Sequence, residues 1–147
     1  MNIKEQITND IKDAMRAKDK NVLSTLRLIT AAVKQIEVDE RIDVDEDRML
    51  VILDKMTKQR KESIAQYQKA NRDDLVAQEQ FELEIIAKYM PEPFSSEEIN
   101  LLIQEAIKET GAEKMSDMGK VMALLKNKLQ GRADMALVSS LIKAQLS

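Results

Sequence analysis

The chain has 147 residues, of which 44% are hydrophobic and 33% charged, so it is long enough to bury a core and too short for more than two modest domains. It contains neither cysteine nor histidine, which excludes disulfides and thiolate metal sites and removes the usual general base near neutral pH. The formal net charge of −3 argues against a general nucleic-acid binder, because nonspecific affinity comes mainly from cations that replace counterions.

Apolar residues recur three and four positions apart through the first 90 residues, and this spacing predicts helices. We expect a first helix capped by Asn2, a second that follows Asp19, and a third that Asp43 or Asp45 caps. A fourth helix is expected from "NRDD" to Met90. The apolar positions expected to face the core in the first two helices are Ile3, Ile7, Ile11, Met15, Val22, Leu23, Leu26, Ile29, Ala32, Val33 and Ile36.

Pro91 and Pro93 mark the one clear boundary, because proline lacks an amide donor and disfavours helix in the residue before it. The sequence therefore predicts an all-α protein with an N-terminal helical domain of about four helices at 1–93 and a compact three-helix domain at 94–147. In the second domain, the predicted caps are Ser95 with Glu98 for the fifth helix, Ser116 for the sixth and Asp134 for the seventh, with Gly111 and Gly131 closing the fifth and sixth.

The stretch "MGKVMALLKNKLQGRAD", from Met118 to Asp134, contains the main candidate surface. Helical projection puts Met118, Val121, Met122, Leu125 and Leu129 on the core side, and Leu124 with Lys120 and Lys128 on the opposite side. An exposed leucine among cations, close to Arg132, would suit a phosphate backbone or an acidic partner. The alternative is that the lysines are ordinary solvent-exposed surface and that "GRAD" only ends one helix and begins the next. Gly119 and Ala123, four residues apart, favour close packing by another helix, and the alternative for Gly119 is a role at the helix start.

A second basic segment lies on the third helix and just after it, at Lys58, Arg60, Lys61 and Arg72. These side chains could form a binding surface or an exposed helix face that exchanges ion pairs with nearby carboxylates. Acidic residues crowd positions 39–47, but the segment lacks the glycine and the terminal glutamate of a helix-loop-helix calcium site. The sequence thus indicates no metal site, no cofactor and no catalytic residue.

Several separated segments resemble the YqeY family: "TLRLITAAVKQIE", "KQRKESIAQYQKANRDDL", "YMPE" and "MGKVMALLKNKLQGRADMALVSSLI". The C-terminal domain of that family is similar to the tail domain of the B subunit of the glutamine-dependent Glu-tRNA/Asp-tRNA amidotransferase, where the tail helps to hold tRNA. The resemblance implies tRNA contacts at Lys120, Lys126, Lys128 and Arg132. The family pattern often has glycine where this chain has Ala123 and Met135.

These observations predict a noncatalytic, tRNA-associated accessory protein whose C-terminal domain contacts tRNA or a tRNA-processing enzyme through Lys120, Leu124, Lys126, Lys128 and Arg132. One alternative is participation in glutamine-dependent amide transfer on aminoacyl-tRNA, that is, carbon-nitrogen ligase activity by homology. The other is a protein-binding helical adaptor. The charged, amphipathic start of the chain has neither a secretory signal nor a membrane span, so we expect a cytoplasmic protein with no membrane partner and no DNA partner.

Overall fold

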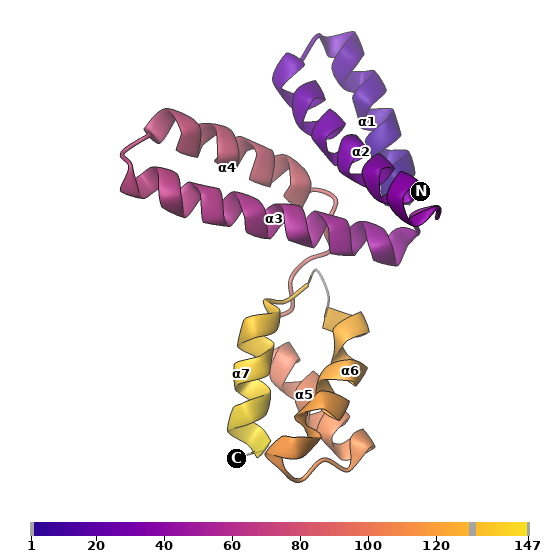
Figure 1. Cartoon of the computed structure of the whole chain (residues 1–147), viewed down its shortest axis with the longest axis vertical. Helices are drawn as coiled ribbons and strands as arrows, with labels where there is room; N and C mark the ends of the chain where they lie inside the picture. Colours follow the sequence, from indigo (N-terminus) through magenta and orange to yellow (C-terminus); the bar gives the residue numbers. More distant parts are fainter. Residues whose placement is uncertain (1, 130–131, 147) are drawn as a thin grey trace. The chain divides into compact units, whose positions relative to one another are not determined.

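The computed structural model describes residues 2–129 and 132–146, apart from the side chain of Asn127. In that part of the chain it contains seven α-helices, a single turn of 3-10 helix and no strand (Figure 1). The protein is therefore all-α, as predicted. The chain divides into two compact units, Met1–Met90 and Pro91–Ser147, whereas the sequence put the boundary after residue 93. None of the described helices is both long and apolar enough to cross a membrane.

The N-terminal unit consists of two helical hairpins, α1 (Ile3–Ala17) with α2 (Lys20–Glu40) and α3 (Glu46–Lys69) with α4 (Asp73–Ala87) (Figure 1). Three of the four helices begin where a short polar side chain accepts a backbone amide, namely Asn2 from Glu5 N, Asp19 from Val22 N and Asp45 from Arg48 N. The largest fully buried side chains between the hairpins are Leu26, Ile29, Met49, Leu53 and Ile86.

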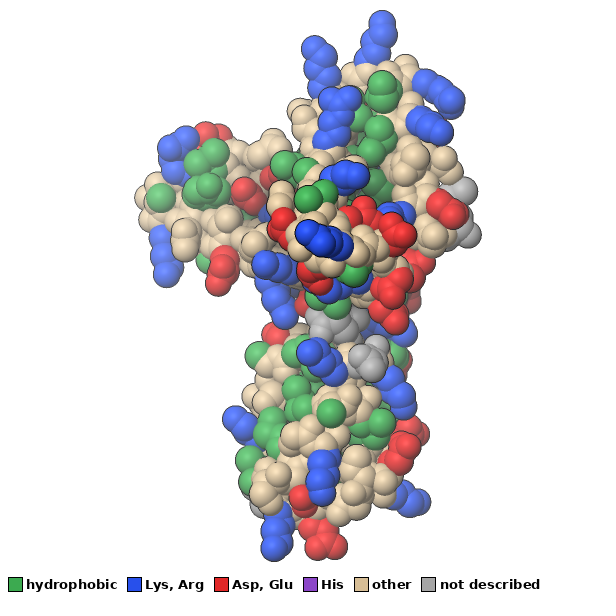
Figure 2. Space-filling model, turned by 45° about the vertical axis from the view of Figure 1, so that its right-hand side comes forward, with side chains coloured by type: hydrophobic (Ala, Val, Ile, Leu, Met, Phe, Trp, Pro, Cys, Tyr) green, Lys and Arg blue, Asp and Glu red, His purple; other side chains and the backbone are tan. Residues whose placement is uncertain are grey.

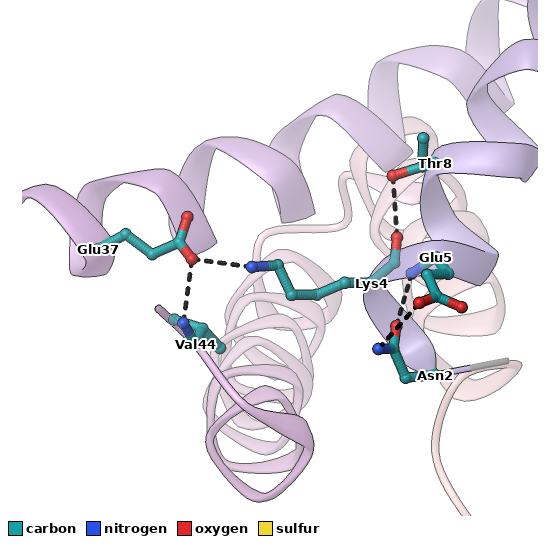
Figure 3. A network of polar contacts seen from close by, with 6 residues as sticks. All are labelled: Asn2, Lys4, Glu5, Thr8, Glu37 and Val44. Carbon is teal, nitrogen blue, oxygen red and sulfur yellow. Dashed lines mark hydrogen bonds and ion pairs between the residues drawn. The ribbon is translucent and has the colours of Figure 1, made fainter. Parts of the chain in front are cut away.

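The loop between α2 and α3 is held by Glu37 (Figure 3). One carboxylate oxygen of Glu37 lies 2.8 Å from Lys4 Nζ and also accepts the amide of Val44 at 3.0 Å. These two hydrogen bonds lower the pKa of Glu37, with the lysine as the larger cause. Because Val44 is itself buried, the loop is fixed by both a polar and an apolar contact.

The C-terminal unit is a three-helix bundle of α5 (Ser96–Thr110), α6 (Met118–Leu129) and α7 (Met135–Leu146). Ser95 and Asp134 accept backbone amides at the starts of α5 and α7, and Gly111 ends α5 with φ of 69°, as predicted. The predicted end of α6 at Gly131 lies outside the described residues. The fully buried core side chains of this unit are Ile103, Val121, Leu125, Leu129, Val138 and Ile142.

Three details of the predicted helices are wrong. Ser116 does not cap α6, because it lies within the 3-10 turn η1 (Met115–Asp117) that precedes the helix. Met15 is 55% exposed and so does not join the core. A methyl group on Gly119 would meet nothing within 4 Å, so no helix packs closely on that flank of α6.

Candidate functional site

Two of the positive charges of the C-terminal unit lie close together in sequence at the end of α6. Lys126 and Lys128 are both exposed in the last turn of that helix, and neither has a carboxylate partner among the described residues. We call these two residues the α6 lysine pair. Cations in a last turn also stabilise a helix by facing its free carbonyl groups. A binding role for the pair must therefore be tested against cations at other helix ends.

The five predicted contact residues do not form one cluster. At about 100° per residue, Lys120, Leu124 and Lys128 share one flank of α6, whereas Lys126 lies roughly 200° around the helix from Lys128. Lys120 is in the first turn of α6, roughly 12 Å along the axis from Lys128 at about 1.5 Å per residue. Any ligand that met all of these cations would have to wrap the end of the helix.

Leu124 is not the exposed leucine that the projection predicted. It is half-buried and packs against the core of the C-terminal unit. On the α6 helix, Leu124 points roughly 100° away from the fully buried Leu125. It therefore lies at the edge of the core-facing stripe and not opposite it. Burial of a flank residue stabilises the bundle, so this side chain offers only part of its surface to a partner.

Arg132 also makes contacts that stabilise the fold. Its guanidinium carbon lies 3.7 Å from the centroid of the Phe94 ring, and its Nε donates a hydrogen bond to the carbonyl of Glu92 at 3.0 Å. The backbone amide of Phe94 donates to the carbonyl of Arg132 at 2.8 Å. These contacts fasten the segment before α5 to the segment before α7, and they cover one face of the guanidinium.

Arg132→Lys is expected to lower the free energy of unfolding by about 1 kcal/mol, because lysine keeps the charge but loses the planar stacking and the Nε donor. Urea denaturation followed by circular dichroism measures this difference. The matched control is Arg27→Lys on the exposed part of α2, where no comparable effect is expected. Equal stability of the Arg132 variant and the wild type would show that these contacts do not support the fold.

Asp117 holds the start of α6, and the sequence did not single it out. Its Oδ2 accepts the backbone amides of Glu113 at 3.1 Å and Lys114 at 3.3 Å, and these hydrogen bonds lower the pKa of Asp117. Its Oδ1 lies 3.9 Å from Lys120 Nζ. An ionised carboxylate thus partly balances Lys120, which is 70% exposed, and leaves the other end of the helix as the positive one.

In the predicted secondary basic surface, most of the positive charges are paired with carboxylates. Lys58 pairs with Asp54 at 3.3 Å and Arg72 with Asp74 at 3.1 Å. The Arg72 guanidinium lowers the pKa of the Asp74 carboxyl. Lys61 is exposed and belongs to no ion pair among the described residues.

Arg60 is not a surface residue. Its side chain is only 13% exposed, and one guanidinium nitrogen lies 3.8 Å from a carboxylate oxygen of the buried Glu82. The same guanidinium donates to the carbonyl of Met56. The predicted surface role is wrong for this residue, because α4 packs over the face of α3 that carries it.

A further basic group lies at the turn between α1 and α2. Arg16, Lys18 and Lys20 are all exposed within five positions of one another, and Lys18 adopts the left-handed conformation that ends α1. Sequence reasoning missed this group, although the pattern "RAKDK" contains it. Figure 2 shows Lys and Arg side chains gathered at one end of the N-terminal unit and Asp and Glu side chains nearer its other end. Among the described residues, no acidic group is arranged to hold a metal ion.

Taken together, the described residues form a small all-α protein of two helical units, with two exposed lysines in the last turn of α6. The chain belongs to the YqeY-like family, because the family model described as "Yqey-like protein" matches residues 4–146.

Several fungal proteins that resemble the chain carry the name "Altered inheritance of mitochondria protein 41, mitochondrial". The protein from Saccharomyces cerevisiae strain YJM789 is 35% identical over 122 residues, which cover 79% of this chain and 66% of the relative. The protein from Lachancea thermotolerans is 37% identical over 106 residues, covering 70% of this chain and 57% of the relative. The protein from Eremothecium gossypii is 40% identical over 85 residues, covering 57% and 46%. The matched part of the chain thus spans less than two thirds of these relatives.

Proposed function

We propose that this protein is a noncatalytic accessory factor that associates with tRNA, or with a tRNA-processing enzyme, through the end of α6. The observation that carries the proposal is the α6 lysine pair, two exposed cations with no carboxylate partner among the described residues. Phosphate groups are the natural counterpart of such cations, and their contacts position a nucleic acid without reading its sequence.

The charge of the whole chain limits how this contact works. With a net charge of −3, most of the surface repels a phosphate backbone, so binding depends on a local cationic region and weakens as salt increases. The four aromatic side chains of the chain are too few for a base-stacking platform. Recognition of folded RNA by shape and backbone fits these limits better than recognition of a single strand, and DNA is not an expected partner.

The proposed tRNA association would take place in a compartment that contains tRNA. The sequence favours the cytoplasm for this chain, and the names of the yeast relatives give "mitochondrial" for those proteins. Both compartments contain tRNA, so the proposal holds for either location. The same reasoning requires no cofactor and assigns no bond-making step to this chain.

The proposal is tested by titrating fluorescently labelled, transcribed tRNA with the full-length protein. Lys126→Glu/Lys128→Glu is expected to weaken binding about tenfold or more at low salt, because each lost phosphate contact and each new repulsion removes affinity. The matched control is Lys108→Glu/Lys143→Glu, which makes the same charge change in the last turns of α5 and α7. The control variant should bind within about threefold of the wild type.

Two outcomes count against the proposal. The first is an absence of salt-dependent tRNA binding by the wild type. The second is an equal loss in the two double variants, which would mean that only the net charge of the protein matters. Melting curves for both variants separate a loss of binding from a loss of structure, since both lose favourable charges at helix ends.

A further inference from the structure

The start of α3 carries a small surface hollow that the proposed tRNA contact does not use. It has a volume of about 310 Å³ and is lined by Ile42, Asp43, Asp45, Asp47, Arg48 and Val51. We call it the α3 hollow. It lies entirely within the N-terminal unit, whereas the α6 lysine pair belongs to the C-terminal unit.

The backbone around the α3 hollow is firmly fixed. Arg41 ends α2 in the left-handed conformation and donates to the carbonyl of Glu37, while Val44 donates to the Glu37 carboxylate, which also binds Lys4 (Figure 3). The amide of Ile3 donates to a carboxylate oxygen of Glu46 at 3.1 Å. A partner that docks here would not have to order the loop, which removes one of the main costs of binding.

The polar groups of the α3 hollow divide into two sets. Asp45 accepts the backbone amide of Arg48 as the cap of α3, and the Arg48 side chain forms a bidentate ion pair with Glu40, so both side chains already have partners within the unit. Asp43 and Asp47 are exposed and have no hydrogen bond or ion pair to another described residue. The hollow therefore presents two uncompensated negative charges to a partner.

The hollow also offers apolar surface. Ile42 is 40% exposed and Val51 is 41% exposed, although both are large aliphatic side chains. The volume is at the lower end of the roughly 300–1,000 Å³ typical of ligand pockets, which suits one or two aliphatic side chains better than a cofactor. Apolar side chains beside charged ones are usual in a protein contact, whose apolar core is surrounded by a polar rim.

We infer that the α3 hollow docks a basic amphipathic segment of a partner protein, with an aliphatic side chain seated between Ile42 and Val51 and lysine or arginine side chains facing Asp43 and Asp47. Charge complementarity selects this occupant. The uncompensated carboxylates repel nucleic acid and acidic surfaces, and they attract a helix that carries cations three or four positions from its apolar anchor. This contact is independent of the tRNA contact, so either can fail without the other.

The test uses full-length protein and a labelled synthetic helix of leucine and lysine, with its leucines three and four positions apart. Ile42→Ser/Val51→Ser is expected to weaken binding about tenfold, because the apolar floor is lost. Asp43→Asn/Asp47→Asn is expected to weaken it about three- to tenfold at low salt. In nuclear magnetic resonance spectra of the wild type, the peptide should shift the amide signals of residues 42–51 more than those elsewhere.

Matched controls separate docking from general attraction of a basic peptide. Leu28→Ser removes a similarly exposed aliphatic side chain from α2. Asp73→Asn removes a carboxylate from the first turn of α4, as Asp47→Asn does from α3. Both controls should bind the peptide as the wild type does. The inference is overturned if the controls lose as much affinity as the hollow variants, or if the shifted signals lie outside residues 42–51. All of these positions are exposed, and tRNA binding should stay unchanged in every variant.

Discussion

Arg60→Met is expected to lower the free energy of unfolding of the N-terminal unit by about 3 kcal/mol. The substitution keeps most of the apolar length of the side chain but removes the charge that faces Glu82, which is 8% exposed. Arg60 and Glu82 come from α3 and α4, and their side chains are 13% and 10% exposed. A carboxylate left in this position would have little water around it and would have lost its paired cation. Thermal or urea denaturation measures the loss.

The same pair should make stability depend on pH in a defined direction. Burial raises the pKa of Glu82, and Arg60 only partly offsets this effect. A carboxyl with a raised folded-state pKa contributes stability that is full below its ordinary pKa and is lost as the pH rises through the folded-state value. In Arg60→Met this loss should be larger, because the offsetting cation is absent.

The double variant Arg60→Met/Glu82→Gln is the control for this prediction. It has no buried charge at this position, so it should recover much of the lost stability and lose the extra dependence on pH. The account of this pair is wrong if Arg60→Met is equally destabilised at pH 4 and pH 8, or if Glu82→Gln restores nothing in its background.

Leu53→Ala and Leu125→Ala are each expected to lower stability by about 3 kcal/mol, the usual cost of removing a buried leucine side chain. Both leucines are at most 1% exposed, and they belong to two core clusters that share no residue. Hydrogen exchange should therefore speed up mainly in residues 3–87 for the first variant and mainly in residues 96–146 for the second.

The control for these core variants is Leu101→Ala. Leu101 is 59% exposed on α5, so its truncation should change stability by less than about 0.5 kcal/mol. A uniform increase in exchange over the whole chain, in either core variant, would contradict the view that each core stabilises its own unit.

Helix starts and ends were the most predictable part of the fold, because each depends on residues only three or four positions apart. Asn2, Asp19, Asp45, Ser95 and Asp134 all cap helices through their own side chains, and Gly111 ends α5. The information for such a cap is local, so the sequence contains it in full. Ser116 does not cap α6, because it lies within the 3-10 turn η1 and the helix begins only at Met118.

The environment of individual side chains was less predictable, because it depends on which helix covers which face. From the sequence, Arg60 was predicted to belong to an exposed basic segment. In the folded chain, α4 packs on α3 and places Glu82 beside it. Leu124 looked exposed on a helical projection but packs at the edge of the core. Arg132 looked like a free cation in a turn, and only the folded chain places Phe94 and Glu92 beside it. For Arg60 and Arg132 the deciding partner is distant in sequence.

The most direct test of the proposed function is the salt dependence of tRNA binding. For the wild type, the logarithm of the binding constant should fall linearly with the logarithm of salt concentration, by roughly 0.7–0.9 for each phosphate that a lysine neutralises. Lys126→Gln/Lys128→Gln should therefore reduce the magnitude of that slope by roughly 1.5. Equal slopes for the two proteins would show that the end of α6 does not meet the phosphate backbone.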